Sequence, residues 1–375
     1  MSIPSAILGI VLILVILGDA FETIVFPRRV TRRVRLARLF YRYTWKLWSG
    51  LVASMSSGRP QETYFSFYGP LSLLLLLVLW ATGLIIGFGL LLRSVGATGE
   101  AGFGTYLYLS GTTFFTLGIG DVVPHTSLGR AVTAVEAGTG FAFLALVIGY
   151  LPALNQSFSR REVSISLLDA RAGSPPTAVE MLRRYSYDSG IDALQQLLHE
   201  WERWSADFLE AHLSYPVLAY FRSQHDNQSW LAALTTILDT CALIIVGMKG
   251  PCVRQAELTF AMARHAVVDL SIIFSRPPLK PEPDRLPPSE LASLRTTLEP
   301  AGLQLREGGE AEEKLGELRR MYEPYVYSLS RYLRIRLPPW IAEEGRTDNW
   351  QTSAWGRVSS FRKAGKTERD EEKHF

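Results

Sequence analysis

Thirty consecutive residues, 63–92, carry no charged side chain, and this stretch most constrains how the chain can fold. It includes a run of five leucines at 73–77. A helix of about 20 apolar residues crosses the hydrocarbon core of a bilayer. The stretches 3–26 and 128–151 are also long and apolar enough. The sequence therefore predicts an all-α membrane protein with transmembrane helices at 3–26, 67–92 and 128–151, and excludes a fully soluble or a disordered chain.

Basic residues predict the orientation of these helices. Eight of them, and no acidic residue, lie between Arg28 and Lys46. Because basic segments beside a span stay in the cytoplasm, we expect the N-terminus outside and the C-terminal half in the cytoplasm. The protein is then a multi-pass protein of the plasma or inner membrane. A cleaved signal peptide is disfavoured, since no basic residue precedes the first apolar run and no small-x-small site follows it.

The basic segment itself has two interpretations. Its arginines at 29, 32, 35 and 38 recur every third residue, as in a voltage sensor. Further arginines at 28, 33 and 42 make the segment too polar to span a membrane. We therefore expect an amphipathic helix on anionic lipid headgroups, with Val30, Val34, Ala37 and Phe40 toward the lipid. Asp19 and Glu22, at the end of the first span, are expected to pair with the arginines beyond it.

A glycine-rich motif lies between the second and third predicted spans. Residues 113–121 read T-F-F-T-L-G-I-G-D. This resembles the Thr-x-x-Thr-x-Gly-aromatic-Gly-Asp signature of tetrameric pore-loop potassium channels, bacterial type, here with an extra N-terminal span. The resemblance covers about residues 64–155 and continues in Pro124, Gly129-Arg130 and Gly140. Its position between two spans, after a short helix, makes the motif more specific than a glycine-rich loop alone.

The resemblance implies a pore helix at 105–115 and a selectivity filter formed by Thr116, Leu117, Gly118, Ile119 and Gly120. The carbonyl oxygens of residues 116–119 would bind K⁺ in place of its hydration water. Glycine tolerates positive φ, which such a filter requires at alternate residues. One pore loop per chain supplies a quarter of a filter, so a homotetramer is implied.

Several residues around the filter are candidates for its support. Thr112 and Thr113 would lie behind it and Asp121 at its outer mouth. Glu136, the lone acid of the last span, would either reach the same region or bond a neighbouring helix, and both interpretations stay open. Ile119 departs from the usual aromatic residue, so we expect a softer filter that still prefers potassium.

The third span would line the inner cavity. The resemblance implies a hinge at Gly140. It also places four residues toward the pore, namely Phe141, Leu144, Ile148 and Pro152. Glycines in a span are also common sites of close helix packing, and this alternative stays open for Gly140.

The chain divides by sequence into an N-terminal span (1–27), a basic amphipathic segment (28–62), a pore domain (63–155), a helical cytoplasmic domain (156–340) and a flexible tail (341–375). A proline-rich linker is expected at 276–288. The segment 230–274 is either membrane-embedded or buried in a soluble bundle. The second is favoured, because a membrane hairpin would place Lys249 and Arg254 outside.

The remaining sequence shows no nucleotide-binding glycine motif, no catalytic constellation and no metal-ligand spacing. Cys241 and Cys252 are interpreted as buried or free thiols. We expect no enzyme activity, no cofactor and no nucleic-acid partner, and a ligand of the cytoplasmic domain is not indicated. The resulting prediction is a potassium-selective channel. The alternatives are a weakly selective cation channel and a non-conducting, membrane-anchored helical adaptor.

Overall fold

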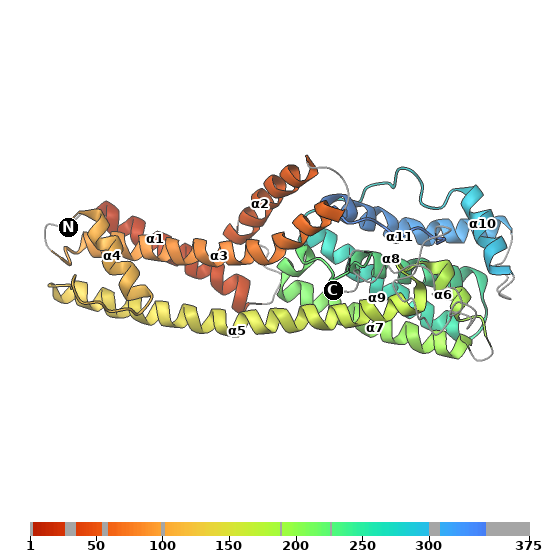
Figure 1. The fold of residues 1–375 in the computed structure, drawn as a ribbon, viewed down its shortest axis with the longest axis horizontal. Helices are drawn as coiled ribbons and strands as arrows, with labels where there is room; N and C mark the ends of the chain where they lie inside the picture. Colours follow the sequence, from red (N-terminus) through yellow and green to blue (C-terminus); the bar gives the residue numbers. More distant parts are fainter. Residues whose placement is uncertain are drawn as a thin grey trace, which may run out of the picture. The chain divides into compact units, whose positions relative to one another are not determined.

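The computed structural model describes residues 3–26, 35–54, 59–98, 102–187, 190–225, 227–299 and 308–342. Every regular element among these residues is a helix (Figure 1). The chain forms two compact units. The N-terminal unit holds Met1–Glu162 and Asp207–Asp226, and the C-terminal unit holds Val163–Ala206 and Asn227–Phe375.

Two long helices pack closely in the N-terminal unit. They are α1 (Ile3–Ala20), which continues as a π-helix at Phe21–Val25, and α3 (Arg59–Ser94). Glycines line their contact: a Cβ on Gly87 would lie 2.8 Å from Cγ1 of Ile13, and one on Gly9 would lie 2.7 Å from the carbonyl oxygen of Gly87. Small residues let two helices approach this closely, so α1 is an integral part of the unit.

A shorter helix, α2 (Leu36–Ala53), lies obliquely against α3 (Figure 1). It buries Ala37, Trp45 and Val52. The prediction that Ala37 faces lipid is therefore wrong, because this residue belongs to the core formed with α1 and α3. Phe40 packs partly against the same core, and Val30 and Val34 lie outside the described residues.

The last helices of this part are α4 (Phe103–Phe114) and α5 (Ser127–Ala172). The sequence predicts the beginnings of both helices to within two residues, but α5 continues 21 residues past the expected end at 151. It passes through Pro152 without a break and is about 69 Å long at the usual helical rise.

A segment from the C-terminal half returns to the N-terminal unit, which the sequence did not indicate. It comprises the end of α7 (Gly190–Ser214) and a 3-10 turn, η2 (Pro216–Tyr220). The ring of Tyr220 stacks on Tyr41 of α2 at 5.7 Å and lies 5.2 Å from both Trp45 and Tyr68. Aromatic pairs at these distances stabilise beyond their burial alone, so η2 is held between α2 and α3.

The same segment is tied to α5 by a buried arginine. The guanidinium of Arg161 donates to the carbonyl oxygens of Leu218 and Phe221 at 2.8 and 2.9 Å, and to Glu162 at 2.9 Å. A charge-assisted hydrogen bond to a backbone carbonyl is stronger than a neutral one. Arg161 therefore fixes the chain after α7 against the later turns of α5.

The C-terminal unit is built around α8 (Trp230–Gly247), which contacts α6 (Ala178–Arg184), α9 (Pro251–Ile273) and α11 (Gly309–Leu333). A further helix, α10 (Pro288–Leu298), follows the proline-rich segment, and 274–287 contains no helix. Residues 343–375 of the expected flexible tail lie outside the described residues.

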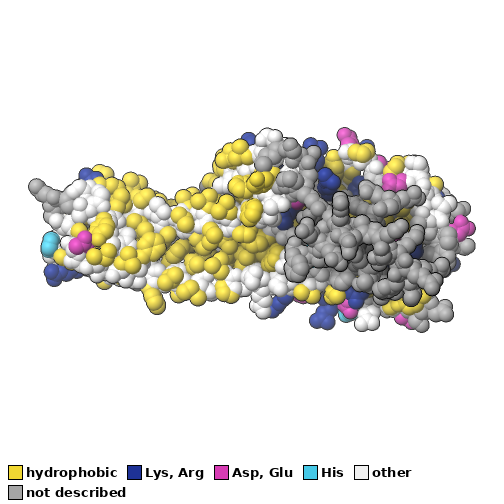
Figure 2. Space-filling model, viewed as in Figure 1, with side chains coloured by type: hydrophobic (Ala, Val, Ile, Leu, Met, Phe, Trp, Pro, Cys, Tyr) yellow, Lys and Arg dark blue, Asp and Glu magenta, His cyan; other side chains and the backbone are white. Residues whose placement is uncertain are grey.

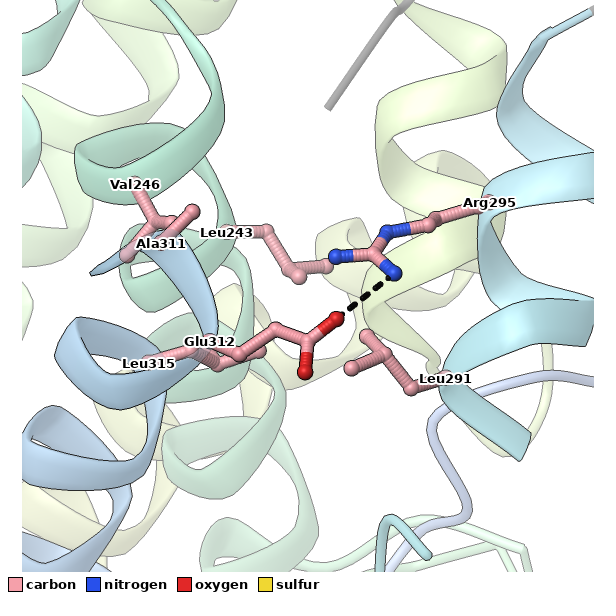
Figure 3. A pocket seen from close by; sticks show the side chains of 7 residues that line it. All are labelled: Leu243, Val246, Leu291, Arg295, Ala311, Glu312 and Leu315. Atoms are coloured by element: carbon pink, nitrogen blue, oxygen red, sulfur yellow. Dashed lines mark hydrogen bonds and ion pairs between the residues drawn. The ribbon is translucent and has the colours of Figure 1, made fainter. Parts of the chain in front are cut away.

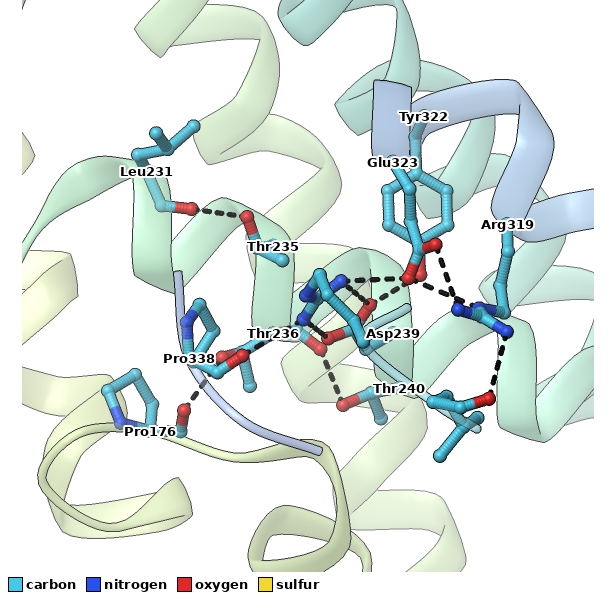
Figure 4. Close-up of polar contacts among 12 residues, drawn as sticks. Pro176, Leu231, Thr235, Thr236, Asp239, Thr240, Arg319, Tyr322, Glu323 and Pro338 are labelled. Carbon is cyan, nitrogen blue, oxygen red and sulfur yellow. Dashed lines mark hydrogen bonds and ion pairs between the residues drawn. The ribbon is translucent and has the colours of Figure 1, made fainter. Parts of the chain in front are cut away.

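A network of ion pairs surrounds the one acidic residue of α8 (Figure 4). Asp239 accepts from Arg285 at 2.7 Å and from the hydroxyl of Tyr322. Arg285 also pairs with Glu323 at 3.0 Å, and Glu323 pairs with Arg319 at 3.0 Å. Burial alone would lower the pKa of Arg285, but the charges of Asp239 and Glu323 outweigh it and raise this pKa. A buried charge of this kind is tolerated because it is paired and hydrogen-bonded.

Four of the described helices are long and apolar enough to cross a membrane: α1 with its π-helical end, α3, α5 and α8. They differ in how much of the apolar window the chain itself covers, which is 22%, 44%, 11% and 83%, respectively. Figure 2 shows hydrophobic side chains spread over the surface of the N-terminal unit. The first three helices thus leave apolar surface for other contacts, whereas α8 is enclosed by its own unit.

Candidate functional site: the pore loop

The loop after α4 folds back on the end of that helix. Its N–H groups at Leu117 and Gly118 donate to the carbonyl oxygen of Thr112 at 2.8 and 3.4 Å. The N–H of Thr116 donates to the carbonyl of Thr113 at 2.9 Å. The last carbonyls of a helix have no partner within it, and here the loop supplies them. Thr112 and Thr113 therefore act through their backbone, at the base of the loop.

The backbone of the loop alternates in hand. Thr116, Gly118 and Gly120 have φ of 55°, 57° and 83°, and each is separated from the next by a single residue. Glycine adopts this region at no steric cost, whereas a non-glycine residue is strained there by about 1 kcal/mol or more. The sequence pointed to the two glycines but not to Thr116, because residue type rarely indicates a left-handed threonine.

Side chains of the loop are open in the single chain. Leu117 is 64% exposed and Ile119 is 59% exposed. Neither side chain is covered by the rest of the described chain.

Asp121 is held by an aromatic residue that the sequence did not single out. The hydroxyl of Tyr108, on α4, donates to Oδ2 of Asp121 at 2.9 Å. The other carboxylate oxygen accepts the N–H of Val122 at 3.0 Å. The end of the loop is thus tied to the helix before it. The sequence contains one indication of this pair: a tyrosine in the helix lies 13 residues before the aspartate that follows the glycines.

Glu136 is fully buried and reaches the pore helix rather than the loop itself. Its carboxylate contacts the hydroxyl of Ser110, which also lies 2.8 Å from the carbonyl oxygen of Ile85. Thr112 takes no part, because its hydroxyl donates to the carbonyl of Leu109 at 3.0 Å. One serine on α4 therefore joins α3 and α5, and the sequence indicated only the acid.

One turn further along α5, Gly140 lies against the end of α4. A Cβ on this residue would stand 1.9 Å from the carbonyl oxygen of Phe114. The ring of Phe114 also packs on Phe143 of α5 at 5.7 Å. Gly140 is thus a close-packing site, whatever bending the helix permits there.

The four residues assigned to the cavity lie away from this contact. Each is exposed in the single chain, whereas the buried positions of α5 between 127 and 154 are 129, 136, 140, 150 and 154. The exposed set forms one apolar stripe with helical spacing, consisting of Phe141, Leu144, Ile148 and Pro152.

A pocket between α8, α10 and α11 has space for about one water molecule and is closed by the ion pair Arg295–Glu312 at 2.9 Å (Figure 3). No group of three or more His, Cys, Asp or Glu side chains within the described ranges could hold a metal ion. The pore loop is therefore the candidate functional site.

Comparison with known proteins agrees with this choice. Residues 73–156 match the family Ion_trans_2, described as "Ion channel", and the match includes α4, the loop and the beginning of α5. The chain is also similar to the uncharacterized membrane protein YdjJ of Bacillus subtilis (strain 168), with 24% identity over 236 residues, 58% of this chain and 67% of that protein. No solved structure gives a significant match. The chain is therefore a membrane protein that carries an ion channel domain at residues 73–156.

Proposed function

We propose that this protein is a potassium-selective channel that conducts K⁺ passively through the T-L-G-I-G loop at 116–120. The observation that carries the proposal is the alternation of positive φ at Thr116, Gly118 and Gly120. In an ordinary strand, successive carbonyl groups point to opposite sides. Alternating the hand of the backbone turns them to the same side, which is what a file of carbonyl oxygens around K⁺ requires.

Four copies of the chain complete the pore in this proposal. A single loop provides one wall of the filter, and its side chains at Leu117 and Ile119 stand open in the single chain. A homotetramer with the loops around a four-fold axis covers these side chains. The partial negative charge at the C-terminal end of α4 would point toward the pore and favour a cation there.

The surrounding residues have distinct roles. Thr112 and Thr113 hold the base of the loop through their carbonyls. Asp121, tied to Tyr108, sets the outer mouth. Glu136 positions α4 through Ser110. The cavity below the filter is lined by the apolar stripe of α5, and such a constriction can close by dewetting.

The basic residues from Arg28 to Lys46 favour a location in the plasma or inner membrane with the N-terminus outside and the C-terminal half in the cytoplasm. In this arrangement α8 is the core of a cytoplasmic bundle. Its enclosure by α6, α9 and α11, and the ion pairs at Asp239, support that assignment. The ion channel domain points to transport rather than catalysis.

The test is a reversal potential in a planar bilayer, with potassium on one side and sodium on the other. A value near the potassium limit is expected. Gly118→Ala should abolish the current or its selectivity, because its Cβ meets no atom within 4 Å and only the positive φ is affected. Gly111→Ala is the matched control: it lies in α4, has the same open surroundings, and needs no positive φ.

Two other outcomes would change the assignment. A current with a reversal potential near zero indicates a weakly selective cation channel, a candidate favoured by Ile119 in place of an aromatic residue. In that case, Ile119→Tyr should restore selectivity. No current from tetramers that are shown to be intact indicates a membrane-anchored adaptor whose loop does not conduct.

A further inference from the structure

The outward side of α2 is divided between two kinds of side chain. Seen along the helix, Ala37, Trp45 and Val52 face the protein. A second stripe is basic and exposed, with Arg38, Arg42 and Lys46 at four-residue spacing. A third stripe is apolar: Tyr43, Leu47 and Leu51 repeat at the same spacing and are 66%, 67% and 59% exposed. Residues four apart share a helix face, so each stripe is continuous.

Both ends of α2 are fixed to helices that carry membrane spans. At its start, the carboxylate of Asp19 on α1 accepts the N–H of Ala37 at 3.0 and 3.2 Å, and Arg35 lies 3.5 Å from Glu22. At its end, the amide of Gln61 on α3 donates to the carbonyl of Val52 at 3.2 Å. Because α1 ends and α3 begins at these contacts, α2 lies where two spans leave the bilayer.

The fixing contacts are built into the core. Asp19 is buried and also accepts from the indole N–H of Trp80 at 3.0 Å. A carboxylate at a helix N-terminus accepts hydrogen bonds from N–H groups that have no partner within the helix. Its negative charge is also stabilised by the positive end of the helix dipole. The sequence suggested arginines as partners of Asp19; among the described residues, its carboxylate instead accepts from the backbone of Ala37 and the indole of Trp80, and so holds the first turn of α2 in place.

We propose that the outward side of α2 binds anionic phospholipid, with Arg38, Arg42 and Lys46 on the phosphates and Tyr43, Leu47 and Leu51 among the acyl chains. Within the described part of the chain, no carboxylate pairs with any of these three cations. A basic stripe beside an apolar stripe is the pattern of a helix at a membrane surface. Each lysine or arginine there adds about fivefold to the binding of an anionic lipid. The proposal does not depend on conduction.

The position of the apolar stripe is tested first, with the full chain in nanodiscs. Both native cysteines are buried, so a new cysteine can be spin-labelled alone. A label at Leu47→Cys should collide more often with oxygen, which concentrates in lipid, than with a water-soluble nickel complex. Glu200→Cys, on the exposed side of α7, should show the reverse. Nickel access at position 47 would overturn the proposal, and so would protection from both reagents, which indicates a second copy packed on α2.

The basic stripe is tested with spin-labelled phosphatidylglycerol and phosphatidylcholine, which report lipid held at the protein surface. The wild-type chain should hold phosphatidylglycerol in preference, and salt should weaken that preference. The variant Arg38→Gln/Arg42→Gln/Lys46→Gln should lose it. The matched control removes three exposed cations of the C-terminal unit, Arg203→Gln/Arg254→Gln/Lys314→Gln, and should keep it. Equal preference in the two triple variants would overturn the assignment.

Discussion

Gly140 lies so close to the end of the pore helix that a Cβ there would stand 1.9 Å from the carbonyl oxygen of Phe114. Backbone atoms cannot move aside as a flexible side chain can, so Gly140→Ala must push α4 and α5 apart. Overpacking of this kind typically costs about 1–3 kcal/mol. We expect a lower melting temperature and a loss of current, measured by thermal unfolding in detergent and by liposome flux.

Gly149→Ala is the control for this substitution. Gly149 lies on the same helix, and no atom of the rest of the chain lies within 4 Å of a Cβ added there. It should melt and conduct like the wild type. Wild-type behaviour of Gly140→Ala would show that α4 and α5 are free to separate at this point.

Glu136 and Ser110 provide a second contact between the same two helices. Glu136→Gln keeps a side-chain oxygen that accepts from the serine, whereas Glu136→Ala leaves the buried hydroxyl with one partner fewer. The hydroxyl still donates to the carbonyl oxygen of Ile85 at 2.8 Å, so the lost hydrogen bond is worth about 0.5–1.5 kcal/mol. We expect faster loss of current and weaker K⁺ selectivity in the alanine variant than in the glutamine variant, both measured in bilayers. Identical behaviour of the two variants would assign Glu136 a packing role only.

The long apolar helices and the left-handed glycines of the loop at 116–120 could be predicted from the sequence because each has a local physical cause. A charge-free run such as 63–92 has few stable places outside a bilayer or a core, and two glycines separated by one residue permit a left-handed backbone. The sequence predicted that Thr112 and Thr113 lie near the loop, but not which of their atoms contact it. Which atoms meet depends on the packing of α4 against α5.

Contacts between distant segments could not be predicted in the same way. Asp19 was expected to pair with arginines because they are the nearest basic residues along the chain, but its carboxylate accepts from the backbone of α2 and the indole of Trp80. Likewise, nothing near Tyr220 indicates that its ring lies on Tyr41. These partners are 18 to 179 residues apart, and single-sequence patterns do not reach that far.

The tether between Tyr108 and Asp121 predicts a change in the outer mouth. Tyr108→Phe removes the one hydrogen bond from α4 to the Asp121 carboxylate, at a solvent-exposed site where its effect on stability is small. We expect currents that decay faster under steady voltage. If the bond is the cause, Asp121→Ala, which removes the acceptor, should give at least the same effect, and the double variant should be no worse than Asp121→Ala. Additive effects in that cycle would contradict the tether.

A substitution of Arg285 tests how strongly the stability of the C-terminal unit depends on its buried ion pairs. Arg285→Met leaves Asp239 and Glu323 without their shared cation inside the unit. Removing one partner of a buried pair costs about 3–5 kcal/mol. We expect a markedly lower melting temperature by circular dichroism. Arg254→Met, which removes an exposed pair with Glu257, should change it little, and an equal drop in both variants would contradict the role of the network.

We expect acid to destabilise the fold because His212 is buried in its neutral form. Burial, and then the nearby charge of Arg161, lower the pKa of His212 from 6.5 to about 3. Its ring N–H at Nδ1 donates to the carbonyl oxygen of Phe208 at 2.7 Å. Between pH 3 and 6.5 the unfolded chain takes up a proton at this site that the folded chain does not, so the folded state is favoured less as the pH falls. The contribution of this histidine to the free energy of unfolding is complete above pH 6.5 and drops by up to about 1.4 kcal/mol for each pH unit below it.

The test compares the melting temperatures of His212→Gln and the wild type between about pH 7.5 and 5, where this titration begins. The melting temperature of His212→Gln should fall less steeply with falling pH than that of the wild type. His125→Gln, which changes an exposed histidine, should leave the slope as it is, and an unchanged slope in His212→Gln would place the acid sensitivity elsewhere.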